Sequence, residues 1–167
     1  MDAPTILPWY VLRVKVQFER VVRSKLSVLN IEALVPVQVQ VRRWSDRTKR
    51  MEVVLFPGYV FVQVDHIRRE DVFKVGREVL GYLQSNGQPA VLKEWEVVMI
   101  KQLVKLDQPV TVVGGGLIPG RTVTISSGPL RGYVGVLKTF SGRHRVLLEI
   151  DSLKCVAEVE VAISDVE

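Results

Sequence analysis

LFPGYVFV, residues 55–62, is the most informative segment of this sequence. In an extended strand, Tyr59 and Phe61 point to one face, whereas Val60 and Val62 point to the other. The Pro-Gly pair before them predicts a kink or a bulge in the chain. Two neighbouring rings on one face would form a rigid, amphipathic anchor for a partner. The alternative is that both rings cover helices of their own domain.

Hydrophobic periodicity predicts strands and helices on both sides of this segment. A short apolar run predicts a strand over residues 9–15, and apolar residues at helical spacing predict an amphipathic helix over 17–29. Further candidates are a short helix at 68–75, a strand at 79–84 and a second helix at 93–106, in which Trp95, Val98, Met99, Leu103 and Leu106 form one apolar stripe. This mixture predicts an α+β domain, an antiparallel sheet flanked by helices.

Residues 33–42 alternate strictly, which predicts a half-buried strand. One side carries Ala33, Val35, Val37, Val39 and Val41, and the other carries Leu34, Pro36, Gln38, Gln40 and Arg42. Residues 52–65 would form the second arm of a long hairpin, with the polar run 45–50 as its exposed tip.

The pattern changes after residue 107. Residues 108–116 include three consecutive glycines, which predict a flexible linker between a first domain, 1–107, and a second, 117–167. Four short apolar segments separated by Gly and Pro turns predict a small β-barrel in the second domain. They are residues 121–126, 133–139, 145–150 and 157–161.

The charge is distributed unevenly between the two parts. Residues 1–108 carry 17 Lys and Arg against 12 Asp and Glu, whereas residues 109–167 carry 6 of each. The excess positive charge therefore predicts that the first part meets a polyanion or an acidic protein surface. Simple solubility is the alternative.

The sequence offers no pattern that predicts an enzyme, a metal site or a cofactor. His66 and His144 lack neighbours at metal-ligand spacing, and we expect neither to bind a metal. The glycines at 114–116 lack the Lys-Ser or Lys-Thr pair of a phosphate-binding loop. Cys155 follows Lys154, which could lower the pKa of the thiol, but a buried, inert thiol is the commoner case.

Three further observations predict a cytoplasmic protein. The chain has no apolar run of membrane-spanning length, and Met1–Pro8 shows no basic region followed by an apolar core, so we expect no signal peptide. The single cysteine agrees with a reducing compartment.

Three segments in this order resemble the NusG family of transcription elongation factors. They are Trp9-Tyr10-Val11, the segment 55–62, and GPLRGYVGV at residues 128–136. The resemblance covers residues 9–166 and implies an NGN-like first domain and an SH3-like KOW barrel. The residues matching the KOW motif are Gly128, Pro129, Leu130, Arg131, Gly132, Tyr133 and Gly135. The short tip at 43–47 is similar to the UpxY-type antiterminator paralogues.

The resemblance also implies partners. The first domain would bind the clamp helices of the largest RNA polymerase subunit, suppress pausing or termination, and contact non-template or upstream DNA. The polymerase-binding positions would be Phe56, Pro57, Gly58, Tyr59 and Phe61, and the DNA-binding positions Lys15, Arg20, Arg23, Arg42, Arg43 and Arg47. A solvated helix face is the alternative reading of Arg20 and Arg23.

The neutral barrel would recruit a protein, such as ribosomal protein S10 or the termination factor Rho. We expect a monomer whose barrel is folded in the free protein. Two alternative functions remain at this stage: a general NusG-type factor that promotes pausing or Rho-dependent termination, and an RNA-binding or ribosome-binding KOW protein.

Overall fold

The computed structural model describes residues 5–167 and divides the chain into two compact units. The first contains the residues up to Val35 together with Phe56–Glu94, and the second contains Pro36–Leu55 and Trp95–Glu167. The prediction that no signal peptide is present rests partly on residues 1–4, which lie outside the described residues. These units differ from the two domains, 1–107 and 117–167, that the sequence predicts. The domain boundaries at 107 and 117 therefore stay a prediction.

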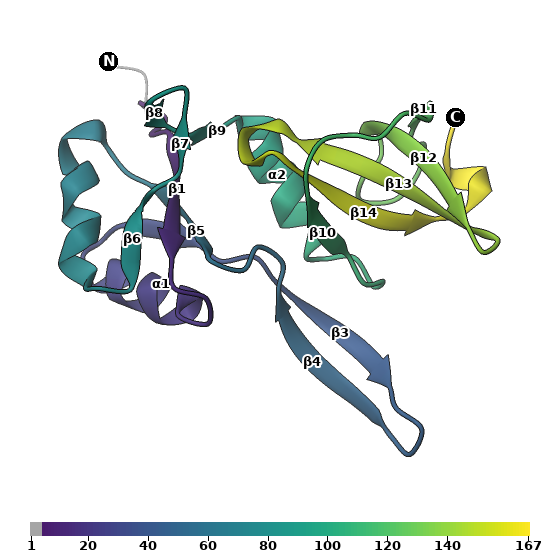
Figure 1. The fold of residues 1–167 in the computed structure, drawn as a ribbon, viewed down its shortest axis with the longest axis horizontal. Coiled ribbons are helices and arrows are strands. Elements are labelled where there is room, and N and C mark those ends of the chain that lie inside the picture. Colours follow the sequence, from purple (N-terminus) through teal and green to yellow (C-terminus); the bar gives the residue numbers. More distant parts are fainter. Residues whose placement is uncertain (1–4) are drawn as a thin grey trace. The chain divides into compact units, whose positions relative to one another are not determined.

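The first unit is built on an antiparallel five-stranded sheet with β1 at its centre (Figure 1). The strands are β1 (Trp9–Val14), β2 (Glu32–Leu34), β5 (Tyr59–Gln63), β6 (Val79–Tyr82) and β9 (Val91–Leu92). Their order is β2-β5-β1-β6, and β9 also pairs with β1. Val11 lies opposite Phe61, so the apolar run predicted at 9–15 forms the middle of the core.

Helix α1 (Glu19–Val28) packs against β2 and β5, and the 3₁₀ helix η1 (His66–Val75) lies beside β6 and α1. The helical spacing of α1 buries Val22 and Leu26 completely. Asp65 caps the N-terminus of η1, because its carboxylate accepts a hydrogen bond from the amide of Ile67 (3.1 Å).

A tight hairpin follows β6 in this unit. Its strands are β7 (Gln84–Ser85) and β8 (Gln88–Pro89). Asn86 and Gly87 both have positive φ angles, 52° and 76°. Positive φ angles at both central residues are typical of an Asn-Gly turn in a two-residue hairpin.

The second unit contains a five-stranded antiparallel barrel sheet of order β10-β14-β13-β12-β11. Its strands are β10 (Thr111–Gly114), β11 (Arg121–Thr124), β12 (Val134–Phe140), β13 (Arg143–Ile150) and β14 (Cys155–Val161). Two short 3₁₀ turns, η2 (Asp151–Leu153) and η3 (Ile163–Asp165), flank β14. After η3 the chain reaches β11, where Thr124 and Glu167 exchange backbone hydrogen bonds of 2.8 and 2.9 Å. This contact pairs the C-terminal residues with the edge strand β11, and the predicted α+β class with a small barrel is confirmed.

Strand β10 lies inside the segment predicted as a linker. Residues 111–114 pair along their whole length with β14, from Thr111 opposite Glu158 to Gly114 opposite Cys155. Val110 is buried and Val112 is half-buried, so apolar packing outweighs the flexibility that the glycines predict. The prediction of a linker is therefore wrong for residues 111–114.

The β3–β4 hairpin (β3, Val37–Arg43; β4, Thr48–Val54) belongs to the same unit as helix α2 (Glu94–Leu103). The amide of Gln38 donates to the carbonyls of Leu103 (3.4 Å), Leu106 (3.1 Å) and Gln108 (2.8 Å). The buried face of the hairpin is thus the glutamine face, and Val39 and Val41 on the other face are about half exposed.

Helix α2 turns only part of the predicted stripe inward. Met99 and Leu103 are buried as predicted, whereas Trp95 and Val98 are each 47% exposed, and Val97 and Ile100 are buried in addition. Glu96 is buried as well, and its carboxylate accepts hydrogen bonds from the amide (3.1 Å) and the hydroxyl (2.5 Å) of Ser152. The predicted stripe is therefore wrong at Trp95 and Val98, and the buried face includes the carboxylate of Glu96.

Candidate functional site

The turn before β5 is held tightly against the beginning of α1. Gly58 adopts a φ of +82°, and its amide donates to the Glu19 carboxylate at 2.7 Å. Its carbonyl accepts from the amide of Val14 at 2.9 Å. Glu19 is buried, and the sequence analysis missed it; its position in the first turn of a helix was the available signal.

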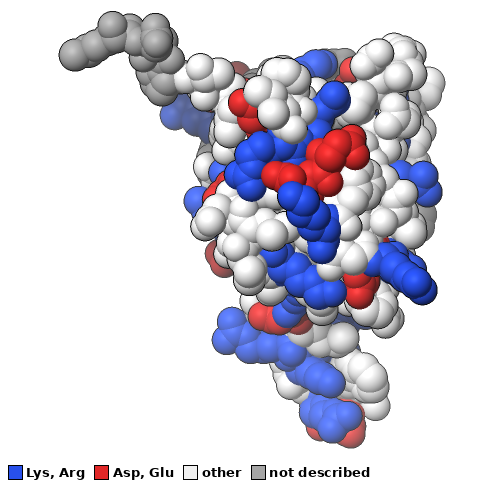
Figure 2. Space-filling view, turned by 90° about the vertical axis from the view of Figure 1, so that its left-hand side faces the viewer, with Lys and Arg blue, Asp and Glu red and all other residues white. Residues whose placement is uncertain are grey.

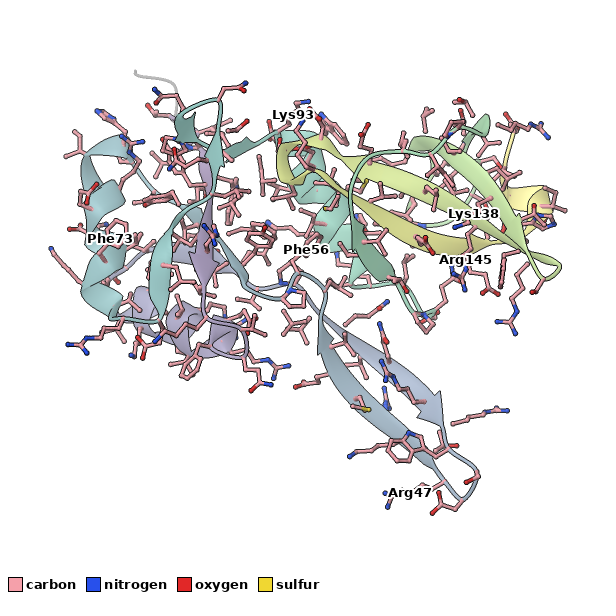
Figure 3. The ribbon with its side chains drawn as sticks, viewed as in Figure 1. Arg47, Phe56, Phe73, Lys93, Lys138 and Arg145 are labelled. Atoms are coloured by element: carbon pink, nitrogen blue, oxygen red, sulfur yellow. The ribbon has the colours of Figure 1, made fainter. Side chains whose placement is uncertain are left out.

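Both phenylalanines of the segment are buried. The strand alternates as predicted, since Tyr59 lies opposite Arg13 and Phe61 opposite Val11 on the same face of the sheet. Phe61 nevertheless has no exposed surface, and Phe56, which is labelled in Figure 3, has 2%. Their rings meet edge to face at 5.4 Å. The expected pair of outward rings is therefore wrong for Phe61, because its neighbour Phe56 folds over it. Tyr59 is half-buried.

Accessible apolar surface does occur around this turn. Pro57 is exposed, and Val16 and Phe18, which follow β1, are 61% and 41% exposed. A methyl group added to Gly58 would lie 3.6 Å from Val16, which shows how close the two segments are. Pro57, Val16 and Phe18 thus border one turn, which we call the apolar turn.

The other face of the sheet in this unit is occupied by η1. The Tyr82 ring meets Tyr10 at 5.6 Å and Phe73 at 6.0 Å, and its hydroxyl donates to the carbonyl of Arg69 (2.7 Å). Burial raises the pKa of the Tyr82 hydroxyl.

The predicted DNA-binding residues fall into two groups. Lys15, Arg20 and Arg23 belong to the first unit, and all three are exposed. Arg23 lines an open, mainly polar depression of about 400 Å³. Its other lining residues are Ser24, Ser27, Ile31, Glu32 and Ala33.

The second group is on the β3–β4 hairpin. Lys and Arg side chains, drawn in blue, gather at the lower end of the molecule in Figure 2. Figure 3 places Arg47 at the end of the hairpin. The turn is closed by a hydrogen bond from the Trp44 amide to the Arg47 carbonyl (2.7 Å). We define the basic tip as Arg42, Arg43, Trp44, Arg47, Lys49 and Arg50, all of which are exposed. The sequence analysis noted the cations but assigned no role to Trp44.

The predicted KOW residues form the turn between β11 and β12. Gly128 and Gly132 have φ angles of +75° and +90°, and Gly132 donates to the carbonyl of Ile125 (2.7 Å). Gly135 is needed for space, because a Cβ there would lie 2.5 Å from the Leu147 carbonyl oxygen. Leu130 is buried beneath the turn.

Three KOW side chains remain accessible within this unit. Pro129 and Arg131 are exposed and Tyr133 is half-buried, and burial raises the pKa of the Tyr133 hydroxyl. Together with Val98 and Gln102 of the α2 region, they line an open depression of about 360 Å³.

The remaining reactive side chains have structural partners. His66 lies 2.9 Å from Asp65, and His144 lies 3.0 Å from the Thr139 hydroxyl. Burial is the main reason that the pKa of the Cys155 thiol rises to about 12, and Lys154 pairs with Asp151 (2.6 Å). Across residues 5–167, His, Cys, Asp and Glu form no group of three that could hold a metal ion.

No helix in the described part of the chain is long and apolar enough to cross a membrane.

An antiparallel α+β sheet combined with a small KOW-type barrel defines a class of proteins, the transcription factors with NGN-like and KOW parts. A family model described as "Transcription termination factor nusG" matches residues 7–101, and the chain therefore belongs to the NusG family. It is a transcription factor of the NusG type.

The relatives span nearly the same length as this chain. The transcription termination/antitermination protein NusG of Streptococcus pyogenes serotype M1 is 27% identical over 92% of both chains. The protein of the same name from Buchnera aphidicola subsp. Baizongia pistaciae is 29% identical over 78% of both. The solved structure titled "Domain interaction in Thermotoga maritima NusG" is 27% identical, covers 96% of both chains and gives a TM-score of 0.57.

Proposed function

We propose that this chain binds RNA polymerase during elongation and suppresses pausing or termination. The proposed contact is with the clamp helices of the largest polymerase subunit. The observation that carries the proposal is the accessible apolar turn next to Tyr59, on a chain of the NusG family. Tighter binding to the closed polymerase than to the open, paused enzyme would shift the population toward elongation.

The five proposed polymerase-binding residues have three different roles. Pro57 and Tyr59 offer surface to a partner and would make the contact. Gly58 gives the turn its left-handed backbone, and its hydrogen bonds to Glu19 and Val14 hold the turn in place. Phe56 and Phe61 would support the turn from the core and position it, since both are buried.

We extend the proposal to DNA in the transcription bubble. Lys15, Arg20 and Arg23 in the first unit are exposed cations and would contact phosphates. Arg42, Arg43 and Arg47 in the second unit would contact non-template or upstream DNA in the same way.

The barrel would recruit a protein rather than RNA, with ribosomal protein S10 and Rho as candidates. Its equal numbers of acidic and basic residues support a partner that is not chosen by charge. The short hairpin tip supports a specialised, UpxY-type role. The names of the relatives, which include both termination and antitermination, favour the general NusG-type role as the second candidate.

The polymerase contact is tested by co-purification of the full chain with core polymerase. We expect Tyr59→Ala to lower the affinity at least about tenfold, because truncating a half-exposed aromatic anchor removes contact area but little core packing. Ile67→Ala is the matched control, since Ile67 is an apolar residue of the same unit that is 77% exposed on η1. Wild-type affinity of Tyr59→Ala would show that the contact is elsewhere.

The direction of the effect is tested by a termination assay on a long template. Greater read-through with the wild-type chain, lost in Tyr59→Ala, is expected from the proposal. More Rho-dependent termination would instead support the general NusG-type role.

A further inference from the structure

The basic tip carries charge that the fold of the hairpin does not explain. Arg42 and Lys49 lie directly opposite each other on neighbouring strands, and like charges in such cross-strand pairs are destabilising. Within residues 5–167, Arg42, Arg43, Lys49 and Arg50 take part in none of the ion pairs. An anionic ligand would relieve this repulsion.

Trp44 adds a second observation that points to a ligand. Its side chain is 53% exposed although tryptophan is largely apolar. The Arg47 guanidinium lies 5.7 Å from the centre of its ring, in a cation–π contact. The indole is thereby held at the end of a two-stranded ribbon, between cations on both strands.

We propose that the basic tip is a binding site for single-stranded nucleic acid, in which Trp44 stacks on an unpaired base. The cations on both strands would contact the phosphates on either side of that base. The inference rests on the nucleic-acid part of the proposed function and adds the ligand class and the stacking residue.

The tryptophan favours a single strand over a duplex. A two-stranded ribbon is narrow enough to enter a major groove, and the cations alone would suit a duplex equally well. The bases of a duplex, however, are stacked on one another and offer no free ring face to an indole. An unpaired base offers a free ring face, and stacking on aromatic side chains is the usual mode of single-strand binding.

The test uses the full chain, a labelled oligonucleotide of about 12 nucleotides, long enough for a typical single-strand site, and a duplex of the same sequence. We expect Trp44→Ala to weaken single-strand binding roughly tenfold. Trp44→Phe should bind within about threefold of the wild type, because phenylalanine retains a ring that stacks. Duplex binding should be unchanged in Trp44→Ala. Parallel DNA and RNA oligonucleotides identify the source of the single strand.

Salt dependence separates stacking from phosphate contact. Trp44→Ala should leave the slope of log affinity against log salt unchanged, whereas the double variant Arg42→Ala/Lys49→Ala should flatten it by about 1 to 1.5. Phe140→Ala is the matched control, because Phe140 is 68% exposed at the end of another hairpin, β12–β13, of the same unit.

Two results would overturn the inference: wild-type single-strand affinity of Trp44→Ala, or an equal loss on single strand and duplex. The assay contains no polymerase, so a failure of the proposed polymerase contact leaves its outcome unaffected. Conversely, Trp44→Ala should co-purify with core polymerase as the wild type does.

Discussion

At the scale of single residues, Gly135 shows how one missing Cβ shapes the barrel. A Cβ at this position would lie 2.5 Å from both the Leu147 carbonyl oxygen and the Val146 side chain. We expect Gly135→Ala to lower the free energy of unfolding by about 2 kcal/mol, because the backbone of β13 cannot move away without breaking its ladder. The measurement is urea denaturation followed by tryptophan fluorescence and circular dichroism.

Gly114 supplies the control for this prediction. It lies in β10, a Cβ added there would have no atom within 4 Å, and its φ is not in the left-handed region. Gly114→Ala should therefore be neutral or stabilise the protein by about 0.5 kcal/mol, since alanine lowers the entropy of the unfolded chain. Equal denaturation curves for the two variants would contradict the crowding argument.

Single residues also show which features of the candidate site could be predicted from the sequence. The Gly-rich KOW turn was predictable, because only glycine adopts its backbone angles or fits the space at Gly135 easily. The burial of Phe61 was not predictable, because the alternation of side chains along a strand assigns each residue to one face of the sheet but does not show what covers that face. The covering ring of Phe56 comes from the irregular turn before the strand, where no periodicity applies.

At the scale of elements, the β3–β4 hairpin and the end of α2 form one hydrogen-bonded unit. The two N–H groups of the Gln38 side chain are shared among three carbonyl oxygens, and its own oxygen accepts from the Val110 amide (3.0 Å) and from Gln40 (2.9 Å). The last carbonyls of a helix have no partner within the helix, so these glutamines replace water there. Burying the glutamine face is favoured for this reason, although the valines on the other face are more apolar.

We expect Gln38→Glu to lower the free energy of unfolding by about 3 kcal/mol. The substitution removes the donor and directs a buried carboxylate at three carbonyl oxygens, and unsatisfied buried polar groups are costly. Gln88→Glu makes the same change of charge at an exposed position and should alter stability by less than about 0.5 kcal/mol. Similar urea midpoints for the two variants would mean that the glutamine face is solvated.

The elements themselves followed from periodicity, but their orientation did not. Alternation at residues 33–42 predicted a strand and its two faces, and helical spacing predicted α1 and α2. Which face turned inward was decided by carbonyls about 65 to 70 residues away in sequence. Such a tertiary requirement has no local signal, apart from the unusual placement of two glutamines on one side of a strand.

At the scale of the whole molecule, β10 ties the residues before the glycines to the barrel. All four residues of β10 pair with β14, and Gly115 adds a hydrogen bond to the Lys154 carbonyl (2.9 Å). In the same unit, the Gln108 side chain donates to the carbonyl of Glu160. The segment between β10 and β11 that belongs to no strand is therefore short, and it includes residues 116–120.

This arrangement predicts what happens when the chain is cut after β10. A specific protease site introduced at residues 116–119, which are all exposed, should be cleaved in the folded protein. The two fragments should then co-elute in gel filtration, because the β10–β14 ladder and the bond between Glu96 and Ser152 still join them. Val112→Asp, which brings a charge onto the half-buried side of β10, should weaken their association and serves as the control. Separate elution of the unmodified fragments without denaturant would mean that β10 behaves as a linker and that the barrel begins only at β11.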